Sequence, residues 1–231
     1  MNKEYQDLKA FWNQAFEISD ESLQNNDENV EEEDYLKLAP SHKLCNALEV
    51  FKDHQHVLDY GAGSGWASVI MSKLGTKKIT AVDLSENAVK LIKYYAKIFS
   101  IENIDAFTIE DNWLKNEPQE KYDGFFSSNV LDVVPLEVAE DIIKYASIVT
   151  TKDADIVFSF NFYMSPEQMD SKKLEHDGNK LYVNGILRLV SLSDSEWETL
   201  FSKYFKVMKI SYFAWPNEQE ERRRVFFLKK K

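Results

Sequence analysis

The feature that most constrains the fold is an alternation of short apolar strands and amphipathic helices between residues 57 and 160. Helices are predicted over 64–74, 85–99 and 135–149, with five strands placed around them. The predicted strands cover Val57–Tyr60, Ile79–Asp83, Ala106–Ile109, Gly124–Ser127 and Asp155–Phe160. This alternation predicts a parallel sheet covered on both faces, in which ligands bind beyond the carboxyl ends of the strands.

The C-terminal part follows a different pattern. A predicted helix at 193–203 leads into strands at Lys206–Trp215 and Arg224–Leu228. The polar loop between these two strands is so short that they must run antiparallel. Residues 161–192, which precede this helix, are too many for a plain connection, and Asn184-Gly185 between two apolar runs predicts a hairpin within them.

The first 54 residues are predicted to form a helical cover. An amphipathic helix is expected over 3–18, and a second helix is expected to open at Ser41 as its N-cap. The acidic stretch 20–34 between them is interpreted as a solvated connection rather than a metal site. The predicted domains are therefore a cover at 1–54 and a sheet domain at 55–231, with a substrate-side insert at about 161–192.

Charge and cysteine content restrict the partners and the compartment. A formal net charge of −11 argues against nucleic acid, because such binding relies on Lys and Arg side chains that neutralise phosphates. The single cysteine, Cys45, allows no disulfide within the chain and suits a reducing compartment. Residues 1–9 carry no apolar signal sequence, and no apolar run approaches the ~20 residues that span a bilayer. We expect a cytoplasmic protein that binds neither nucleic acid nor membrane.

A glycine-rich turn joins the first predicted strand to the helix that follows it. The segment reads Val57-Leu58-Asp59-Tyr60-Gly61-Ala62-Gly63-Ser64-Gly65. Glycines permit sharp turns and the close approach of a ligand, and a helix N-terminus adds free N–H donors. A dinucleotide-binding turn needs a third small residue where this chain has Trp66, and no P-loop motif occurs. Nucleotide cofactors with a pyrophosphate are therefore disfavoured.

The segment resembles the D/E-x-G-x-G-x-G first motif of the class I S-adenosylmethionine-dependent methyltransferases. The match is complete at Asp59, Gly61, Gly63 and Gly65, and later motifs follow in order over roughly residues 55–160. The resemblance implies S-adenosylmethionine as the cofactor and an α/β fold. In this family the fold is a Rossmann-like three-layer sandwich, whose seven-stranded sheet is mostly parallel with the last strand antiparallel.

The resemblance also implies which residues bind the cofactor. The glycine turn lies against its amino-acid part, and Asp59 reaches its ammonium directly or through water. Asp83 accepts hydrogen bonds from both ribose hydroxyls; the alternative is that Asp83 only caps the next helix, a role that Ser85 already fills. Asp111 accepts from the exocyclic amine of adenine. The full predicted set is Asp59, Gly61, Ala62, Gly63, Gly65, Asp83, Leu84, Asp111, Asn112 and Asn129.

Asn129 ends the fourth predicted strand. By resemblance it faces the methyl-transfer centre, although a polar residue that merely caps a strand end explains it equally well. The Asn/Asp-Pro-Pro-aromatic motif of adenine and glutamine-amide methyltransferases is absent, because Ser127-Ser128-Asn129-Val130 stands there. Cys45 lies too far upstream to be the nucleophile of a cytosine methyltransferase.

These exclusions predict a small-molecule acceptor, bound in the variable parts of the chain. The candidate contacts are Trp12, Tyr35, Phe162, Tyr163 and His176. His176 is the only histidine well placed to act as a base, but a solvated loop histidine is the preferred interpretation. No catalytic residue, metal site or oligomeric state is assigned. Two other functions stay open: a non-catalytic S-adenosylmethionine-binding module and, disfavoured by Trp66, an NAD(P)-dependent oxidoreductase.

Overall fold

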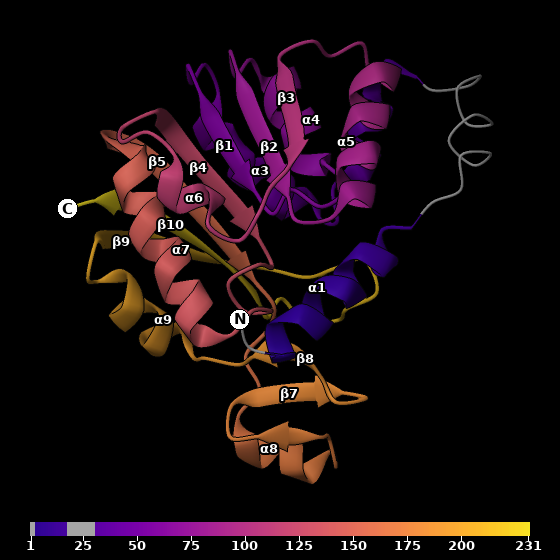
Figure 1. The fold of residues 1–231 in the computed structure, drawn as a ribbon, viewed down its shortest axis with the longest axis vertical. Coiled ribbons are helices and arrows are strands. Elements are labelled where there is room, and N and C mark those ends of the chain that lie inside the picture. Colours follow the sequence, from indigo (N-terminus) through magenta and orange to yellow (C-terminus); the bar gives the residue numbers. More distant parts are fainter. Residues whose placement is uncertain (1–2, 18–30) are drawn as a thin grey trace.

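A seven-stranded sheet forms the centre of the molecule. The structure is a computed structural model, and it describes residues 3–17 and 31–231. The strand order is β3-β2-β1-β4-β5-β10-β9; β1 to β5 run parallel, and β10 is antiparallel to both of its neighbours (Figure 1). The strands are β1 (Val57–Tyr60), β2 (Ile79–Asp83), β3 (Ile104–Thr108), β4 (Tyr122–Ser128), β5 (Thr150–Phe160), β9 (Phe205–Phe213) and β10 (Arg223–Lys230).

Helices cover both faces of this sheet. They are α3 (His42–Ala47), α4 (Trp66–Leu74), α5 (Glu86–Ile98), α6 (Trp113–Asn116), α7 (Leu136–Val149) and α9 (Asp194–Phe201), with 3₁₀ helices η1 (Glu32–Leu38) and η2 (Leu48–Phe51). The first helix, α1 (Lys3–Ala15), packs instead against α5 and the insert. Successive strand residues face opposite layers. Leu58 and Phe125 pack in the cluster that contains α7 and α9, whereas Val57 and Phe126 pack in the cluster of α4 and α5. The predicted three-layer α/β fold, with its last strand antiparallel, is confirmed.

The insert forms a small unit of its own. It contains α8 (Pro166–Ser171) and an antiparallel sheet of β6 (His176–Asp177), β7 (Lys180–Val183) and β8 (Ile186–Val190). In Figure 1 this unit lies below the large sheet, next to α1. Asn184 and Gly185 both have positive φ angles, of 54° and 72°, as a two-residue hairpin turn requires. The predicted hairpin is confirmed.

The predicted strand boundaries agree with the structure for the first two strands and differ for the later ones. The predicted β1 and β2 agree with the structure residue for residue. The fifth strand was predicted to begin at Asp155 but begins at Thr150, since its mostly polar start extends the ladder beyond the apolar run. The last two strands also differ: β9 ends at Phe213 instead of Trp215, and β10 covers Arg223–Lys230.

Two expectations for the N-terminal cover need correction. Residues 18–30, with most of the acidic stretch and the predicted end of the first helix, lie outside the described residues. The stretch 20–34 is not a plain connection throughout, because η1 begins at Glu32. Ser41 occupies the N-cap position of α3, but its side chain makes no capping hydrogen bond. Among the described residues, no helix combines the length and the apolar character needed to cross a membrane.

Candidate functional site

The glycine turn between β1 and α4 adopts a backbone that other residues rarely tolerate. Gly61, Gly63 and Gly65 have φ angles of 68°, 55° and 80°. A Cβ on Gly61 would collide with the Val130 side chain, and one on Gly65 would lie 2.8 Å from Ile92 Cγ1 on α5. A Cβ on Gly63 would approach Phe16 Cζ to 3.2 Å. Gly61 and Gly65 therefore allow close packing within the fold, whereas Gly63 faces the N-terminal cover.

Asp83, at the end of β2, holds this turn in place. Its Oδ2 accepts a hydrogen bond from the Gly63 N–H at 2.9 Å, and its Oδ1 accepts from the Ser85 N–H at 2.9 Å. Ser85 Oγ accepts from Ala88 N–H at 3.2 Å, so Ser85 caps α5 as the sequence predicted. Burial raises the pKa of Asp83. Each carboxylate oxygen has a further lone pair available for a ligand donor.

Asp59, at the start of the turn, is buried and has little to neutralise it. Its Oδ2 accepts from Ser68 Oγ at 2.6 Å, and no salt bridge to it occurs among the described residues. Burial raises the pKa of Asp59 to about 7, and the nearby charge of Asp83 adds to the effect. A cation placed beside Asp59 would restore the ionised form.

A cavity of about 500 Å³ opens at the carboxyl ends of β1, β2 and β4, under α1. This is the position expected for a ligand in such a sheet, and the volume suits a cofactor-sized molecule. Seven predicted cofactor residues line it: Asp59, Gly61, Ala62, Gly63, Asp83, Leu84 and Asn129.

Asn129 presents an unused acceptor at this cavity. Its φ angle of 54° is unusual for a residue other than glycine, and its N–H donates to the Ser159 carbonyl at 2.9 Å. Its Oδ1 is buried without any hydrogen-bond partner in the described structure. Backbone strain together with an unpaired polar atom is typical of a functional position.

Three other predicted cofactor residues do not line the cavity. Gly65 packs against α5 instead. Asp111 forms an ion pair with Lys9 at 2.8 Å, and the Lys9 side chain, not Asp111, lines the cavity. Asn112 occupies the N-cap position of α6 without a capping hydrogen bond. Their contact with adenine or with the loop stays a prediction.

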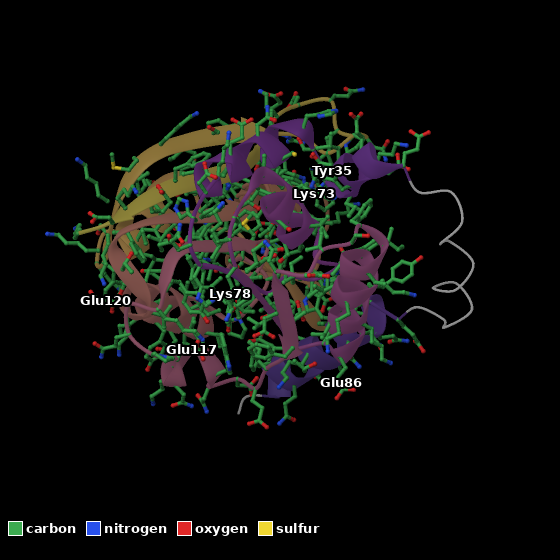
Figure 2. All side chains as sticks on the ribbon, turned by 90° about the horizontal axis from the view of Figure 1, so that it is seen from above. Tyr35, Lys73, Lys78, Glu86, Glu117 and Glu120 are labelled. Atoms are coloured by element: carbon green, nitrogen blue, oxygen red, sulfur yellow. The ribbon has the colours of Figure 1, made fainter. Side chains whose placement is uncertain are left out.

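Of the predicted acceptor contacts, the structure brings only Trp12 to the cavity. Tyr35 packs edge-on against Phe99 and lies beside Lys73, as Figure 2 shows. Tyr163 is among the exposed aromatic residues. His176 Nε2 lies 3.0 Å from Asp170 Oδ1, which raises the pKa of the imidazole.

Phe162 is the remaining candidate. The centre of its ring lies 4.9 Å from Arg222 Cζ, and the residue does not line the cavity. The acceptor role of these residues rests on the sequence alone.

Aromatic walls of the cavity escaped sequence analysis. The additional aromatic side chains that line it are Tyr5, Phe16, Tyr60, Trp66, Phe126 and Trp215. Trp66 was considered only as an obstacle to a dinucleotide. Trp215 was assigned to a strand, but it follows β9. Its ring centre lies 3.4 Å from Arg223 Cζ, and the Nε and Nη2 groups of that guanidinium donate to the Glu218 carboxylate.

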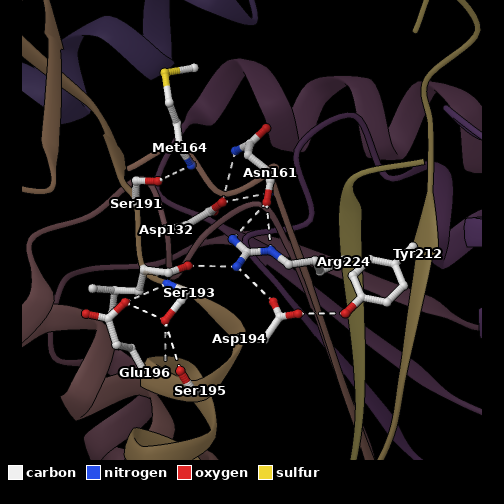
Figure 3. A network of polar contacts seen from close by, with 11 residues as sticks. Asp132, Asn161, Met164, Ser191, Ser193, Asp194, Ser195, Glu196, Tyr212 and Arg224 are labelled. Carbon is white, nitrogen blue, oxygen red and sulfur yellow. Dashed lines mark hydrogen bonds and ion pairs between the residues drawn. The ribbon is translucent and has the colours of Figure 1, made fainter. Parts of the chain in front are cut away.

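A buried polar network fixes both ends of the insert to the sheet (Figure 3). Asp132 follows Asn129 by three residues, and its Oδ2 accepts from the backbone N–H of Asn161, at the start of the insert, at 2.7 Å. The Asp132 carbonyl accepts from Val190 N–H, at the other end, at 2.7 Å. Arg224 on β10 donates to the carbonyls of Asn161 and Leu192. The insert is thereby anchored to the loop that carries Asn129.

No cluster of three or more metal-ligating side chains occurs in the parts of the chain that the structure describes. The site as built consists of a glycine turn, two buried carboxylates, an unpaired amide oxygen and aromatic walls. Such a set can hold an amphipathic, partly cationic molecule and exclude water from it.

Comparison with known proteins gives a consistent picture. Residues 40–159 match the family model described as ribosomal protein L11 methyltransferase (PrmA). A ribosomal protein L11 methyltransferase of Staphylococcus haemolyticus is 31% identical over 158 residues, which are 63% of this chain and 48% of the relative. One from Acetivibrio thermocellus is 40% identical over 67 residues, 28% of this chain and 21% of that protein. The chain spans about half, or less, of the length of these curated relatives.

Solved structures resemble the fold over most of the chain. A putative S-adenosylmethionine-dependent methyltransferase from Listeria monocytogenes has a TM-score of 0.62 at 17% identity, covering 85% of this chain and 99% of its own. The PH0226 protein of Pyrococcus horikoshii reaches 0.67 at 14% identity, covering 93% and 100%. At these identities the likeness establishes the fold.

Proposed function

Since the chain belongs to the ribosomal protein L11 methyltransferase (PrmA) family, we propose that it transfers the methyl group of S-adenosylmethionine to a protein acceptor. The predicted membership of the class I S-adenosylmethionine-dependent methyltransferases is confirmed, and with it the cofactor S-adenosylmethionine. The predicted small-molecule acceptor is wrong: the matching relatives are named for a ribosomal protein as their substrate. The sequence motifs could not predict the acceptor, because the residues in them are those predicted to bind the cofactor.

The observation that carries the proposal is the Asp83 carboxylate at the edge of a glycine-lined cavity. Two backbone N–H groups hold it rigidly, and it is aimed at the cavity that the Gly61–Gly65 turn borders. A carboxylate with free lone pairs matches the paired hydroxyls of a ribose. Asp59, which is buried and has no cationic partner in the described part of the chain, matches the ammonium of the amino-acid part. These residues fit S-adenosylmethionine, and they would hold it by its ribose and its ammonium group.

When bound, the cofactor supplies an electrophilic methyl group, so the protein has chiefly to orient the acceptor and exclude water. The aromatic walls, including Trp66, Phe126 and Trp215, provide the dry surroundings. Asn129 Oδ1 can accept a hydrogen bond from an amine N–H and hold the nitrogen lone pair toward the methyl group. An amide oxygen cannot remove a proton, so we propose that the amine enters in its neutral form.

We further propose that the acceptor protein docks against α1, which contributes residues to the cavity wall, and against the insert, which lies next to α1 in Figure 1. Ribosomal protein L11 is the acceptor to test first, because the relatives that match are named for it. A cytoplasmic location, predicted from the sequence, suits a ribosomal substrate and is part of this proposal.

The proposal is tested by incubating the purified chain with methyl-tritiated S-adenosylmethionine and ribosomal protein L11. We expect label in the protein acceptor, and at least a tenfold loss of transfer for Asn129→Ala with cofactor affinity retained. A non-catalytic module would bind S-adenosylhomocysteine and label neither L11 nor any protein of a ribosomal extract. That outcome would contradict the enzymatic proposal while leaving the cofactor site standing.

A further inference from the structure

Arg188 on β8 is a cation that has no anionic partner within residues 3–17 and 31–231. Its guanidinium makes no hydrogen bond or ion pair with the described residues, and its Nε is buried and unpaired. The β7–β8 register shifts here, so that Leu189 pairs with Leu181 and Leu187 with Tyr182, which leaves Arg188 without a partner strand residue. Such bulges redirect a side chain and are frequent beside functional sites. In a chain of 39 acidic and 28 basic residues, an unpaired arginine calls for an explanation.

Aromatic rings of α1 hold this guanidinium in place. Arg188 Cζ lies 3.9 Å from the centre of the Phe11 ring and 5.4 Å from that of Trp12. Stacking fixes the plane of a guanidinium and leaves its edge N–H groups free to donate. Trp12 contributes a second free donor, since its Nε1 is also buried without an acceptor. Two unpaired donors therefore meet where α1 contacts β8.

Trp12 links this guanidinium, which does not itself line the cavity, to the part of the cavity that borders the glycine turn. Trp12 lines the cavity, and its ring lies 6.3 Å from that of Phe16. Phe16 in turn faces Gly63, where its Cζ would be 3.2 Å from an added Cβ. An anion held by Arg188 and Trp12 would thus lie on the α1 side of the cavity that Asp59 also lines.

We propose that Arg188 and Trp12 form a carboxylate-binding subsite, which takes the carboxylate of the cofactor's amino-acid part. The inference rests on the proposed function, and it adds a contribution from the insert to a site otherwise built by the sheet. Asp59 and Arg188 then bind the ammonium and the carboxylate of one amino acid. Trp12, predicted as an acceptor contact, serves the cofactor instead.

The test compares two ligands by isothermal titration calorimetry: S-adenosylhomocysteine and its decarboxylated analogue, which keeps the amine. The variants are Arg188→Met, which retains a long apolar side chain, and Trp12→Phe, which retains a ring without the N–H. Arg222→Met is the matched control, because Arg222 is exposed and paired with Glu220. We expect Arg188→Met to weaken S-adenosylhomocysteine at least tenfold and Trp12→Phe several-fold, with the analogue unaffected.

The outcomes separate this subsite from its alternatives. If Arg188 only fastens α1 to the insert, Arg188→Met will weaken both ligands equally, which overturns the proposal. An unchanged affinity for S-adenosylhomocysteine overturns it as well, and a higher KM for the acceptor would then assign Arg188 to the acceptor. Wild-type protein that binds neither ligand contradicts the cofactor site itself, and hence the proposed function.

Discussion

At the scale of single residues, the buried acid Asp59 gives the protein a pH dependence. Its pKa of about 7 in the folded chain exceeds the usual value of about 3.9 in an unfolded chain. Asp59 therefore favours folding most below pH 4, and this contribution is lost as the pH rises to about 7. We expect the ligand-free protein to lose about 1 kcal/mol of stability per pH unit over that range relative to Asp59→Asn. Urea unfolding of both proteins between pH 5 and 8 measures the difference; parallel curves would contradict it.

The Asp59 carboxyl group should also make cofactor affinity depend on pH, but the affinity should rise with pH where the stability falls. The ionised form of Asp59 pairs with an ammonium, and below the pKa its population falls about tenfold per pH unit. The affinity for S-adenosylhomocysteine should therefore rise as the pH increases toward 7 and then level off. Calorimetry across this range checks it, and Asp59→Asn should bind weakly without the pH dependence. A wild-type affinity that does not change with pH would remove Asp59 from the site.

Gly63 offers a second test at this scale. Gly63→Val places a branched side chain at a φ angle of 55° and pushes it toward Phe16. Gly178→Val is the matched control, because Gly178 has a φ angle of 58° but open space around its added Cβ. Both variants should lose about 1–2 kcal/mol of stability from backbone strain. Only Gly63→Val should also lose cofactor binding, and equal binding by both would contradict the position of the cofactor.

At the scale of elements, Arg224 determines whether the insert stays on the sheet. Its buried guanidinium donates to the carbonyls of Asn161 and Leu192, as Figure 3 shows, and pairs with Asp194. Arg224→Met leaves these groups unpaired in the interior and should cost about 3–5 kcal/mol of folding free energy. Arg222→Met, on the surface, should cost less than about 0.5 kcal/mol. Urea unfolding of the two variants decides, and equal stabilities would contradict the anchoring.

Elements were the part of the fold that sequence patterns predicted best. The apolar cores of β1 and β2 and the Asn184-Gly185 turn were located because each depends on local chemistry. The polar start of β5 and the 3₁₀ helix η1 were missed, since neither carries an apolar period. The network through Asp132 and Arg224 joins segments that are 92 residues apart in the chain, and no local pattern could indicate it.

At the scale of the whole molecule, the candidate site separates into a part that sequence could predict and a part that it could not. The sheet side follows from the glycine turn and the strand-end acids, so Asp59, Asp83 and Asn129 were found. The cover side comes from the two ends of the chain, where Tyr5 and Trp215 meet at one cavity. Only the folding of the whole chain brings these residues together. Their apolar character is also typical of an ordinary core, so the sequence did not mark them as part of a site.

The central claim is that this cavity binds an adenosyl amino acid whose sugar is held by Asp83. Calorimetry with S-adenosylhomocysteine tests it most directly, with Asp83→Ala as the variant and NADH as the competing ligand. We expect one molecule bound per chain, a loss of about 1–3 kcal/mol of binding free energy in Asp83→Ala, and no binding of NADH. Binding of NADH, or equal affinities of the wild-type protein and the variant for S-adenosylhomocysteine, would contradict the account.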